Sequence, residues 1–265
     1  YLGAFIGLLW FFMPNNLCAI FIEGNLARSL SMIFLPVFIY SVYKYLYNHK
    51  LRYIPLMVFT FLLMELCHLG YAGMVAIAVI IYGIVYMIQK GRKKAVLDVV
   101  ISMIFGFMLL GIWLVASLRG GITSLDNSEN MANFFQNLWI TINPFERLTR
   151  GFEYFYFGFA ALVVIVFGIL FGYKKSRTGF VTGFIILLMT TKSAYAVLKH
   201  LPGSQYLWML RFISIALCMI LMSFLMWDRL KKPLVLMLCV LLAVDTIPSL
   251  SLIVGEHNDI SVQER

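Results

Sequence analysis

The sequence predicts an all-α protein, a polytopic transmembrane helical bundle of about nine spanning segments with an amphipathic helix on its outer face. Two observations support this prediction: the composition and the length of the apolar stretches. Of the 265 residues, 62% are hydrophobic and 12% are charged, and the mean hydropathy is +0.90. Globular chains carry about 25% charged residues, so this chain has too little polar surface to cover a core in water. The composition therefore excludes a water-soluble enzyme, a nucleic-acid-binding module and a disordered protein.

Nine apolar stretches are long enough, or nearly long enough, to cross a bilayer. A spanning helix needs about 20 mostly apolar residues at about 1.5 Å each to cross about 30 Å of hydrocarbon. The stretches are continuous rather than alternating, which favours helices over the strands of a transmembrane barrel. In chain order they cover residues 1–13, 29–47, 53–69, 71–89, 95–117, 153–173, 178–198, 206–227 and 233–254.

The loops between these stretches divide by charge into two alternating sets. Short cytoplasmic loops collect Lys and Arg, and one set holds more than half of the 21 basic residues. We therefore place this set in the cytoplasm, so that the +9 net charge reflects topology and attraction to anionic lipid and needs no nucleic-acid partner. The set consists of Lys44, Lys50, Arg52, Lys90, Arg92, Lys93, Lys94, Lys174, Lys175, Arg177, Arg229, Lys231 and Lys232.

The outer loop at 118–152 is the one long connection, and its middle is predicted to form an amphipathic helix. Apolar side chains recur there at helical spacing and polar ones take the other side, until Asn143-Pro144 ends the pattern. Such a helix would lie along the outer interface, either sealing the bundle or acting as a lid that guides lipid. The apolar positions are Met131, Phe134, Phe135, Leu138, Trp139 and Ile142.

Residues 1–255 are expected to form a single bundle, and residues 256–265 to begin an outer tail. The chain starts at Tyr1 without an initiator Met, so we expect it to be part of a longer protein. The cysteines lie in or beside apolar segments without paired spacing, which predicts neither a disulfide framework nor a metal site. They are Cys18, Cys67, Cys218 and Cys239.

Ionisable residues inside the apolar stretches are the strongest functional signal, because each costs about 2.5–3.5 kcal/mol at the centre of a membrane helix. Five of them fall in the outer third of their stretches, and Glu23 and Arg28 border the same side. We therefore expect these groups to converge in a one-sided cavity that opens outward, whereas an ion path would leave polar groups at several depths. The five are Glu65, His68, Lys192, Arg211 and Asp245.

Each of these residues also has a structural interpretation. Glu65 and His68 are neighbours on one helix face, and they either hydrogen-bond each other in a packing seam or supply a general base. Arg211 either binds a phosphate in bidentate fashion or snorkels to the interface. Asp245 lies in a helix expected to kink at a nearby proline, and it either pairs with Arg211 or acts as a base. Lys192 is either a snorkelling side chain or a ligand.

Several short segments of the chain carry a resemblance to a known family. They are Glu23-Gly-Asn-Leu-Ala-Arg-Ser-Leu continuing through Phe34-Leu-Pro36, Glu65-Leu-Cys-His68-Leu, Trp113-Leu-Val-Ala-Ser-Leu-Arg-Gly-Gly121, Tyr156-Phe-Gly158, and Leu207-Trp-Met-Leu-Arg-Phe-Ile213 followed by Asp245-Thr-Ile-Pro-Ser249. In this order they resemble a family of bacterial polytopic membrane proteins that are named as related to 6-pyruvoyl-tetrahydropterin synthase. The soluble synthase needs a three-histidine zinc site in a compact α/β body, and this sequence predicts neither, so we expect no pterin chemistry.

The family looks like the GT-C architecture of membrane glycosyltransferases, which move a sugar from a polyprenyl-phosphate carrier to an acceptor on the outer face. That resemblance implies a catalytic acid in the first outer loop. Glu23 is the nearest candidate in this chain, and Glu65 and Asp245 are alternatives. A clamp on the carrier phosphate would consist of Arg211, Arg28, His68 and Lys192.

The function implied by this resemblance is transfer of a sugar from polyprenyl phosphate to an envelope acceptor. The alternative is a non-catalytic protein that binds, transports or scaffolds a lipid-linked saccharide, with envelope-assembly proteins as partners. In both cases we expect a multi-pass protein of the bacterial cytoplasmic membrane, in contact with bilayer lipid and with its site facing outward. The sequence shows no cofactor motif and no metal-ligand cluster, although a divalent metal is compatible with a transferase of this kind.

Overall fold

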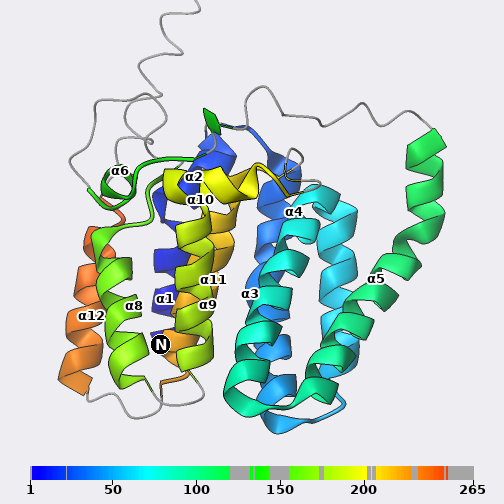
Figure 1. Ribbon diagram of the computed structural model, residues 1–265, viewed down its shortest axis with the longest axis horizontal. Coiled ribbons are helices and arrows are strands. Elements are labelled where there is room, and N and C mark those ends of the chain that lie inside the picture. The colour runs from blue at the N-terminus through cyan, green and yellow to red at the C-terminus, as the bar shows by residue number, and fades with distance from the viewer. Residues whose placement is uncertain are drawn as a thin grey trace, which may run out of the picture.

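The computed structural model is helical, and its described residues contain no strand apart from an isolated bridge between Gln136 and Thr191 (Figure 1). The structure describes residues 2–21, 23–119, 132–133, 135–143, 155–172, 176–201, 204, 207–227, 232–247 and 249. In chain order the elements are α1 (Leu2–Phe11), α2 (Pro14–Phe21), α3 (Leu26–Asn48), α4 (Tyr53–Lys90), α5 (Lys93–Arg119), α6 (Leu138–Ile142), α8 (Phe159–Phe171), α9 (Arg177–Met189), α10 (Lys192–Leu198), the short 3-10 helix η3 (Met209–Arg211), α11 (Phe212–Leu225) and α12 (Lys232–Val244).

Three of these helices are long and apolar enough to cross a membrane: α3, α4 and the part of α5 up to Gly111. Helices α1 and α2 are bent by 56° at a short break, and they count as a fourth span if they cross together. Helices α8, α9, α11 and α12 have 13 or 14 residues each, which cover about 20 Å at 1.5 Å per residue. The protein is therefore an all-α membrane protein with three to four candidate spans in its described part, and the nine predicted spans are not shown.

The predicted stretches are longer than the helices because hydropathy also counts apolar residues outside regular structure. The stretch 178–198, for example, is interrupted at Thr190 and Thr191, where α9 ends and α10 begins. The stretch 153–173 contains α8, which begins only at Phe159. A run of apolar residues thus predicts burial or contact with lipid more reliably than it predicts an unbroken helix.

Helix α4 consists of two antiparallel arms rather than one straight helix. Its backbone leaves helical geometry at His68, where φ is −155° and ψ is 93°, and the chain reverses there (Figure 1). Met64 and Tyr71, on either side of the break, both contact the first turns of α3. Tyr53 and Tyr86, at the far ends of the arms, both contact the second half of α3. The two arms therefore correspond to two of the stretches predicted from the sequence.

Helix α11 is buried along most of its length, and α9 packs against it through small residues. Every residue of Phe212–Leu221 is buried. Gly179 and Gly183 of α9 lie four residues apart and face α11, because a Cβ atom at Gly183 would collide with Ile220 and one at Gly179 with Ser223. Small residues at this spacing let two membrane helices approach closely, so that van der Waals packing holds them together.

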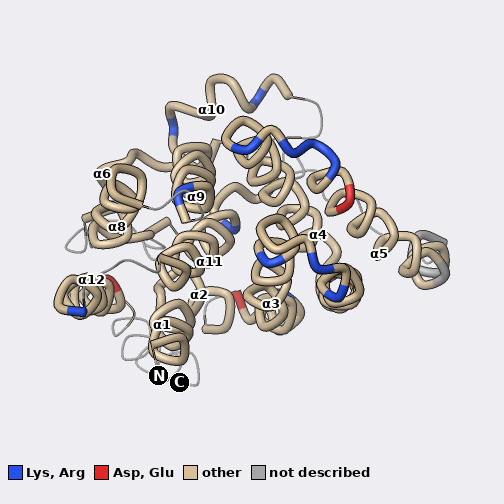
Figure 2. The backbone as a smooth tube through the Cα atoms, turned by 90° about the horizontal axis from the view of Figure 1, so that it is seen from below, with Lys and Arg blue, Asp and Glu red and all other residues tan. Residues whose placement is uncertain are grey.

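The two ends of the bundle differ in charge and in structure. Lys and Arg stand in the short connections and at helix termini of the lower end in Figure 1, which Figure 2 shows from below. We call this the basic end; its described basic residues are Lys50, Arg52, Lys90, Arg92, Lys93, Lys94, Arg177 and Lys232. The opposite end carries α2, α6 and α10, and we call it the loop end. The described parts of the loops predicted to be cytoplasmic thus share one end of the bundle.

The continuous amphipathic helix predicted for the outer loop is wrong. Among the described residues of that pattern, Leu138–Ile142 are α-helical and residues 132–133 form a 3-10 turn, but residues 135–137 between them are not helical. Met131 and Phe134 lie outside the described residues, as do Pro248 and the predicted tail at 256–265.

A long-range backbone pairing explains the missing helical turns. Gln136 N donates to Thr190 O at 3.4 Å, and Lys192 N donates to Gln136 O at 3.0 Å. These bonds satisfy backbone groups that the break between α9 and α10 leaves without helical partners. They also accompany the complete burial of Phe135. Side-chain periodicity along one segment contains no information about such a partner 54 residues away in the chain, as Gln136 and Thr190 are.

Candidate functional site

A tight turn between α2 and α3 carries two of the predicted site residues. Gly24 has a φ of +57°, a left-handed conformation that glycine adopts without the clash of a Cβ atom. Asn25 caps α3, because its Oδ1 atom accepts a hydrogen bond from Arg28 N at 2.9 Å. The turn brings Glu23 back over the first turn of α3, where its side chain meets that of Arg28.

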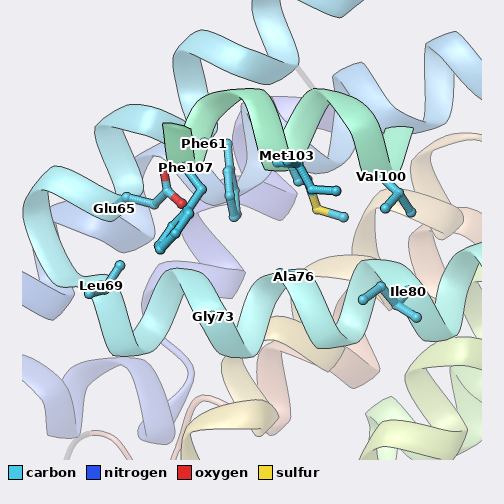
Figure 3. Close-up of a pocket in the computed structure, with 10 residues that line it drawn as sticks. Phe61, Glu65, Leu69, Gly73, Ala76, Ile80, Val100, Met103 and Phe107 are labelled. Atoms are coloured by element: carbon cyan, nitrogen blue, oxygen red, sulfur yellow. The ribbon is translucent and has the colours of Figure 1, made fainter. Parts of the chain in front are cut away.

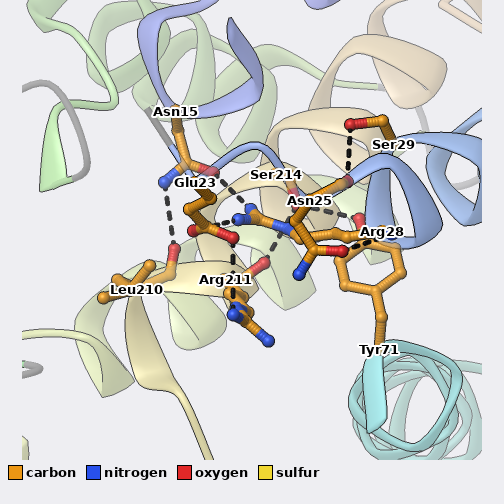
Figure 4. A network of polar contacts seen from close by, with 9 residues as sticks. All are labelled: Asn15, Glu23, Asn25, Arg28, Ser29, Tyr71, Leu210, Arg211 and Ser214. Carbon is orange, nitrogen blue, oxygen red and sulfur yellow. Dashed lines mark hydrogen bonds and ion pairs between the residues drawn. The ribbon is translucent and has the colours of Figure 1, made fainter. Parts of the chain in front are cut away.

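Glu23, Arg28 and Arg211 form one ion-paired group at the loop end, which we call the arginine cluster (Figure 4). Arg28 Nη1 lies 2.6 Å from Glu23 Oε1, and Arg211 Nη2 lies 3.3 Å from Glu23 Oε2. The Arg28 side chain is fully buried, whereas those of Glu23 and Arg211 are 14% and 11% exposed. Because two guanidinium groups face one carboxylate, the cluster has an excess of positive charge.

Neighbouring side chains hold both arginines in position. Asn15 Oδ1 accepts a hydrogen bond from Arg28 Nη2 at 3.4 Å, and the guanidinium carbon of Arg28 lies 5.8 Å from the centre of the Tyr71 ring. The guanidinium carbon of Arg211 lies 4.4 Å from the centre of the Trp208 ring, within the range of a cation–π contact. Arg211 is therefore both partly exposed and oriented before any ligand arrives.

Further hydrogen bonds connect the arginine cluster to the start of α11. Asn15 Nδ2 donates to Leu210 O at 3.1 Å. Tyr71 and Ser214 share a hydrogen bond of 2.8 Å between their hydroxyl groups, and Trp10 Nε1 donates to Ser214 O at 3.1 Å. These bonds link α1, α2 and α4 to the segment that carries Arg211, so several helices hold the arginine cluster in place.

His68 lies at the reversal of α4, three residues before Tyr71, whose ring lies 5.8 Å from the guanidinium carbon of Arg28 in the arginine cluster. Its Nδ1 atom accepts a hydrogen bond from Tyr71 N at 3.1 Å. In the neutral ring the proton is therefore on Nε2, which makes Nε2 a hydrogen-bond donor. The structure thus brings together four of the seven residues that the sequence singled out.

Glu65 lies apart from the arginine cluster, in the first arm of α4. It is only 2% exposed, and it lines an apolar groove between α4 and α5 (Figure 3). Its Oε2 atom has no hydrogen-bond partner among the described residues. The predicted hydrogen bond between Glu65 and His68 is not formed there, because the His68 ring turns back to the backbone of its own helix reversal.

Asp245 occupies a separate site, directly after the end of α12. Tyr156 donates to its Oδ1 atom at 3.0 Å, and Ala161 N, in the first turn of α8, donates to Oδ2 at 2.9 Å. The predicted pairing of Asp245 with Arg211 is therefore wrong, because Tyr156 and the first turn of α8 supply the donors instead. Lys192 is exposed at the first position of α10 and makes none of these contacts.

The described residues contain no group of three or more His, Cys, Asp or Glu side chains arranged to hold a metal ion. The four cysteines are free thiols, and three of them are buried. Among the residues singled out from the sequence, the ones that the structure brings together at the loop end are the arginine cluster and His68.

A known family covers all of these residues. The family model described as "6-pyruvoyl-tetrahydropterin synthase related domain; membrane protein" matches residues 1–253. The chain belongs to this family. Comparisons with curated proteins and with solved structures gave no match. Its family membership therefore establishes a membrane protein, in agreement with its apolar helices.

The sequence predicted the charged residues of the arginine cluster but not the polar residues that hold them in position. Asn15 and Asn16 form a polar pair within an apolar segment, and that pair was a usable signal for buried hydrogen bonding. Tyr71 left no such signal, because tyrosines are spread through the chain and only the reversal of α4 brings this one under Arg28.

Proposed function

We propose that this protein is a glycosyltransferase-like membrane protein that binds a polyprenyl-phosphate-linked sugar at the arginine cluster and transfers the sugar to an envelope acceptor. The geometry of Arg211 is the observation that supports this proposal. Arg211 is partly exposed, stacks on Trp208 and shares the carboxylate of Glu23 with a fully buried arginine. With the basic end in the cytoplasm, the loop end faces the outer side, where such a carrier presents its sugar.

A phosphate group would balance the charge of the arginine cluster. Guanidinium groups bind phosphate through two parallel hydrogen bonds, and the cluster has one more cation than it has carboxylates. The stacking of Arg211 on Trp208 reduces the side-chain entropy that binding costs. The polyprenyl tail would remain in the bilayer while its phosphate reaches Arg211 at the loop end.

In the transfer step, Glu23 is the general base. Its Oε2 atom takes the proton of the acceptor hydroxyl, whose oxygen forms a bond to the anomeric carbon of the sugar as the bond from that carbon to the phosphate oxygen breaks. The electron pair leaves with polyprenyl phosphate, and Arg211 stabilises the added negative charge. Arg211 contacts this same Oε2 atom, so its movement to the phosphate would free the base when the donor binds.

The cluster favours Glu23 over the two alternative acids. Asp245 accepts hydrogen bonds at both carboxylate oxygens in its own site, and Glu65 lines a groove between other helices. Of these three acids, Glu23 is the one that forms ion pairs with Arg28 and Arg211 among the described residues. The base and the phosphate clamp are therefore proposed to be neighbours within one cluster.

A second candidate function is binding or passage of a lipid-linked saccharide without chemistry, alone or with envelope-assembly proteins. One observation favours it: both oxygens of Glu23 are engaged, at 2.6 Å by Arg28 and at 3.3 Å by Arg211. A carboxylate with a cation on each oxygen has neither oxygen open to the proton of an acceptor hydroxyl until one of the two arginines moves.

Binding is tested with tritiated polyprenyl phosphate and the purified protein in detergent, with polyprenol as the ligand that lacks the phosphate. We expect Arg211→Ala to weaken polyprenyl phosphate binding roughly tenfold or more, because a charge-assisted pair is lost, and to leave polyprenol binding unchanged. The matched control is Arg177→Ala, which removes an exposed arginine at the basic end. Equal affinity of wild type and Arg211→Ala for the phosphate would disprove the clamp.

Transfer is tested in proteoliposomes that contain polyprenyl-phosphate-linked hexoses and envelope acceptors. We expect Glu23→Gln to retain polyprenyl phosphate binding and to lose transfer by a factor of about 100 or more, the size of a general-base contribution. Thermal stability is measured in parallel, because Glu23 also pairs with the buried Arg28. Binding without any transfer by the wild type would favour the non-catalytic candidate.

A further inference from the structure

A groove of about 430 Å³ lies between the two arms of α4 and helix α5, away from the arginine cluster (Figure 3). Its walls are apolar except for the carboxyl group of Glu65. Three of the lining side chains, those of Ile80, Ile104 and Phe107, are between 43% and 50% exposed, so the groove opens to the surroundings of the bundle. The main apolar walls are Phe61, Leu69, Ile80, Val100, Met103 and Phe107.

No described residue donates a hydrogen bond to the Oε2 atom of Glu65 in this groove. Glu65 is only 2% exposed. Gly106 of α5 faces it, and a Cβ atom there would stand 3.8 Å from Oε2 and 3.2 Å from the Phe61 ring. The absent side chain at this position leaves room beside the carboxyl group. Burying a polar atom costs free energy unless it forms a hydrogen bond, so a ligand that donates one to Oε2 would recover that cost.

The dimensions of the groove match one aliphatic chain in one leaflet. Along the second arm of α4 it runs from Leu69 to Ile80, which is about 16 Å at 1.5 Å per residue. That length is about half of the roughly 30 Å hydrocarbon thickness of a bilayer. Glu65 lies beside Leu69 at one end of the groove, close to the reversal of α4 at the loop end, while Ile80 lies at the other end (Figure 3).

From these observations we infer that the groove binds a single-chain lipid with a neutral hydroxyl head, taken from the leaflet at the loop end. The chain lies along the second arm of α4, and the hydroxyl group donates a hydrogen bond to Glu65 Oε2. A phosphate or carboxylate head has no proton to donate to Glu65 Oε2, and it would have to lose its hydration in the apolar groove. An ammonium head would have to lose its hydration in an apolar groove, where an ion pair recovers that cost poorly. This inference does not depend on the proposed function, because the arginine cluster is a separate site.

Two glycines make the inference testable without disturbing the fold. Gly73 lines the groove and Gly7 is exposed on α1, outside it, and a Cβ atom at either position would meet no other atom within 4 Å. Gly73→Leu therefore fills the groove, and Gly7→Leu is its matched control. Glu65→Leu keeps the size of the side chain close to that of Glu and removes only the acceptor.

The experiment is photolabelling of the protein in phosphatidylcholine vesicles with four hexadecyl probes that carry a diazirine: the alcohol, its methyl ether, the amine and the carboxylic acid. We expect the alcohol to label α4 and α5 about fivefold more than the ether, the ratio expected for one hydrogen bond of ordinary strength. In Glu65→Leu the alcohol should fall to the level of the ether. Gly73→Leu should lose the labelling, and Gly7→Leu should keep it.

Three results would overturn the inference. The first is equal labelling of the wild type by alcohol and ether, which would mean that the groove takes bulk lipid only. The second is stronger labelling by the amine or the acid than by the alcohol. The third is a preference for the alcohol that survives Glu65→Leu, because the donor would then bind another group.

Discussion

Asp245 and Glu65 are two acidic residues with the same exposure, 2%, but their surroundings differ. Asp245 accepts hydrogen bonds from Tyr156 and from the backbone of Ala161. The Oε2 atom of Glu65 accepts none among the described residues, and an open groove lies beside it. A buried carboxyl group with a complete set of donors stabilises the fold, whereas one without donors is available to a ligand. The comparison teaches that burial alone does not distinguish an acidic residue that stabilises the fold from one that is available to a ligand. The hydrogen-bond donors around the carboxyl group make that distinction.

The largest loss of stability is expected when Asp245, whose two carboxyl oxygens both accept hydrogen bonds, is replaced. Asp245→Ala removes the acceptor of two buried hydrogen bonds, from the Tyr156 hydroxyl and from the Ala161 N–H, so the free energy of unfolding should fall by about 3 kcal/mol. Thermal unfolding in detergent, followed by intrinsic fluorescence, measures this loss. A loss well under 1 kcal/mol would mean that Asp245 is no more structural than Glu65, and the comparison would fail.

The next effect should come from Gly158, which lies against Asp245. Its φ is +96°, and a Cβ atom there would collide with the Asp245 carboxyl group. We expect Gly158→Ala to lower the free energy of unfolding by about 2 kcal/mol, through backbone strain and displacement of the carboxyl group. Gly111→Ala is the control, because a Cβ atom in that part of α5 meets nothing within 4 Å and should leave stability unchanged. Equal stability of the two variants would contradict the close packing around Asp245.

A smaller effect is expected when only one donor is removed. Tyr156→Phe should lower the free energy of unfolding by about 1 kcal/mol, the net contribution of one hydrogen bond. In the Asp245→Ala background the same substitution should cost less than in the wild type, because the hydrogen bond to Asp245 is already gone. The two single variants and the double variant, unfolded under identical conditions, measure this coupling. Additive losses would mean that Tyr156 and Asp245 stabilise the fold independently of each other.

The smallest effect is expected at Glu65. Glu65→Leu replaces a buried group that has no donor on Oε2 with an apolar side chain, so stability should stay the same or rise by up to about 1 kcal/mol. Thermal unfolding alongside the Asp245 variants gives the direct comparison. A clear loss of stability would show that Glu65 has a structural partner, and it would remove the contrast with Asp245.

Much of the fold class followed from composition, because a chain with so few charged residues cannot cover its core in water. The pairing of Glu23 with Arg28 was also within reach, since a Gly-Asn turn lies between them. The sequence did not correctly predict how the seven ionisable residues are arranged, because they do not all converge in one cavity. Depth along a helix says nothing about rotation about its axis, so Glu65 and His68 lie at similar depths and still face different neighbours. The prediction thus grouped residues that lie toward one end of the bundle, but it could not separate them into distinct polar sites.

The reversal of α4 at His68 bears on how this segment enters the membrane during synthesis. The two arms are joined without a polar loop, and the His68 ring accepts the N–H of Tyr71, one of the backbone groups at the break. An unpaired N–H in hydrocarbon costs several kcal/mol, so this bond lowers the barrier for the tip of the reversal to pass through the bilayer. The arms can therefore partition as a single helical hairpin, with no hydrated segment to translocate.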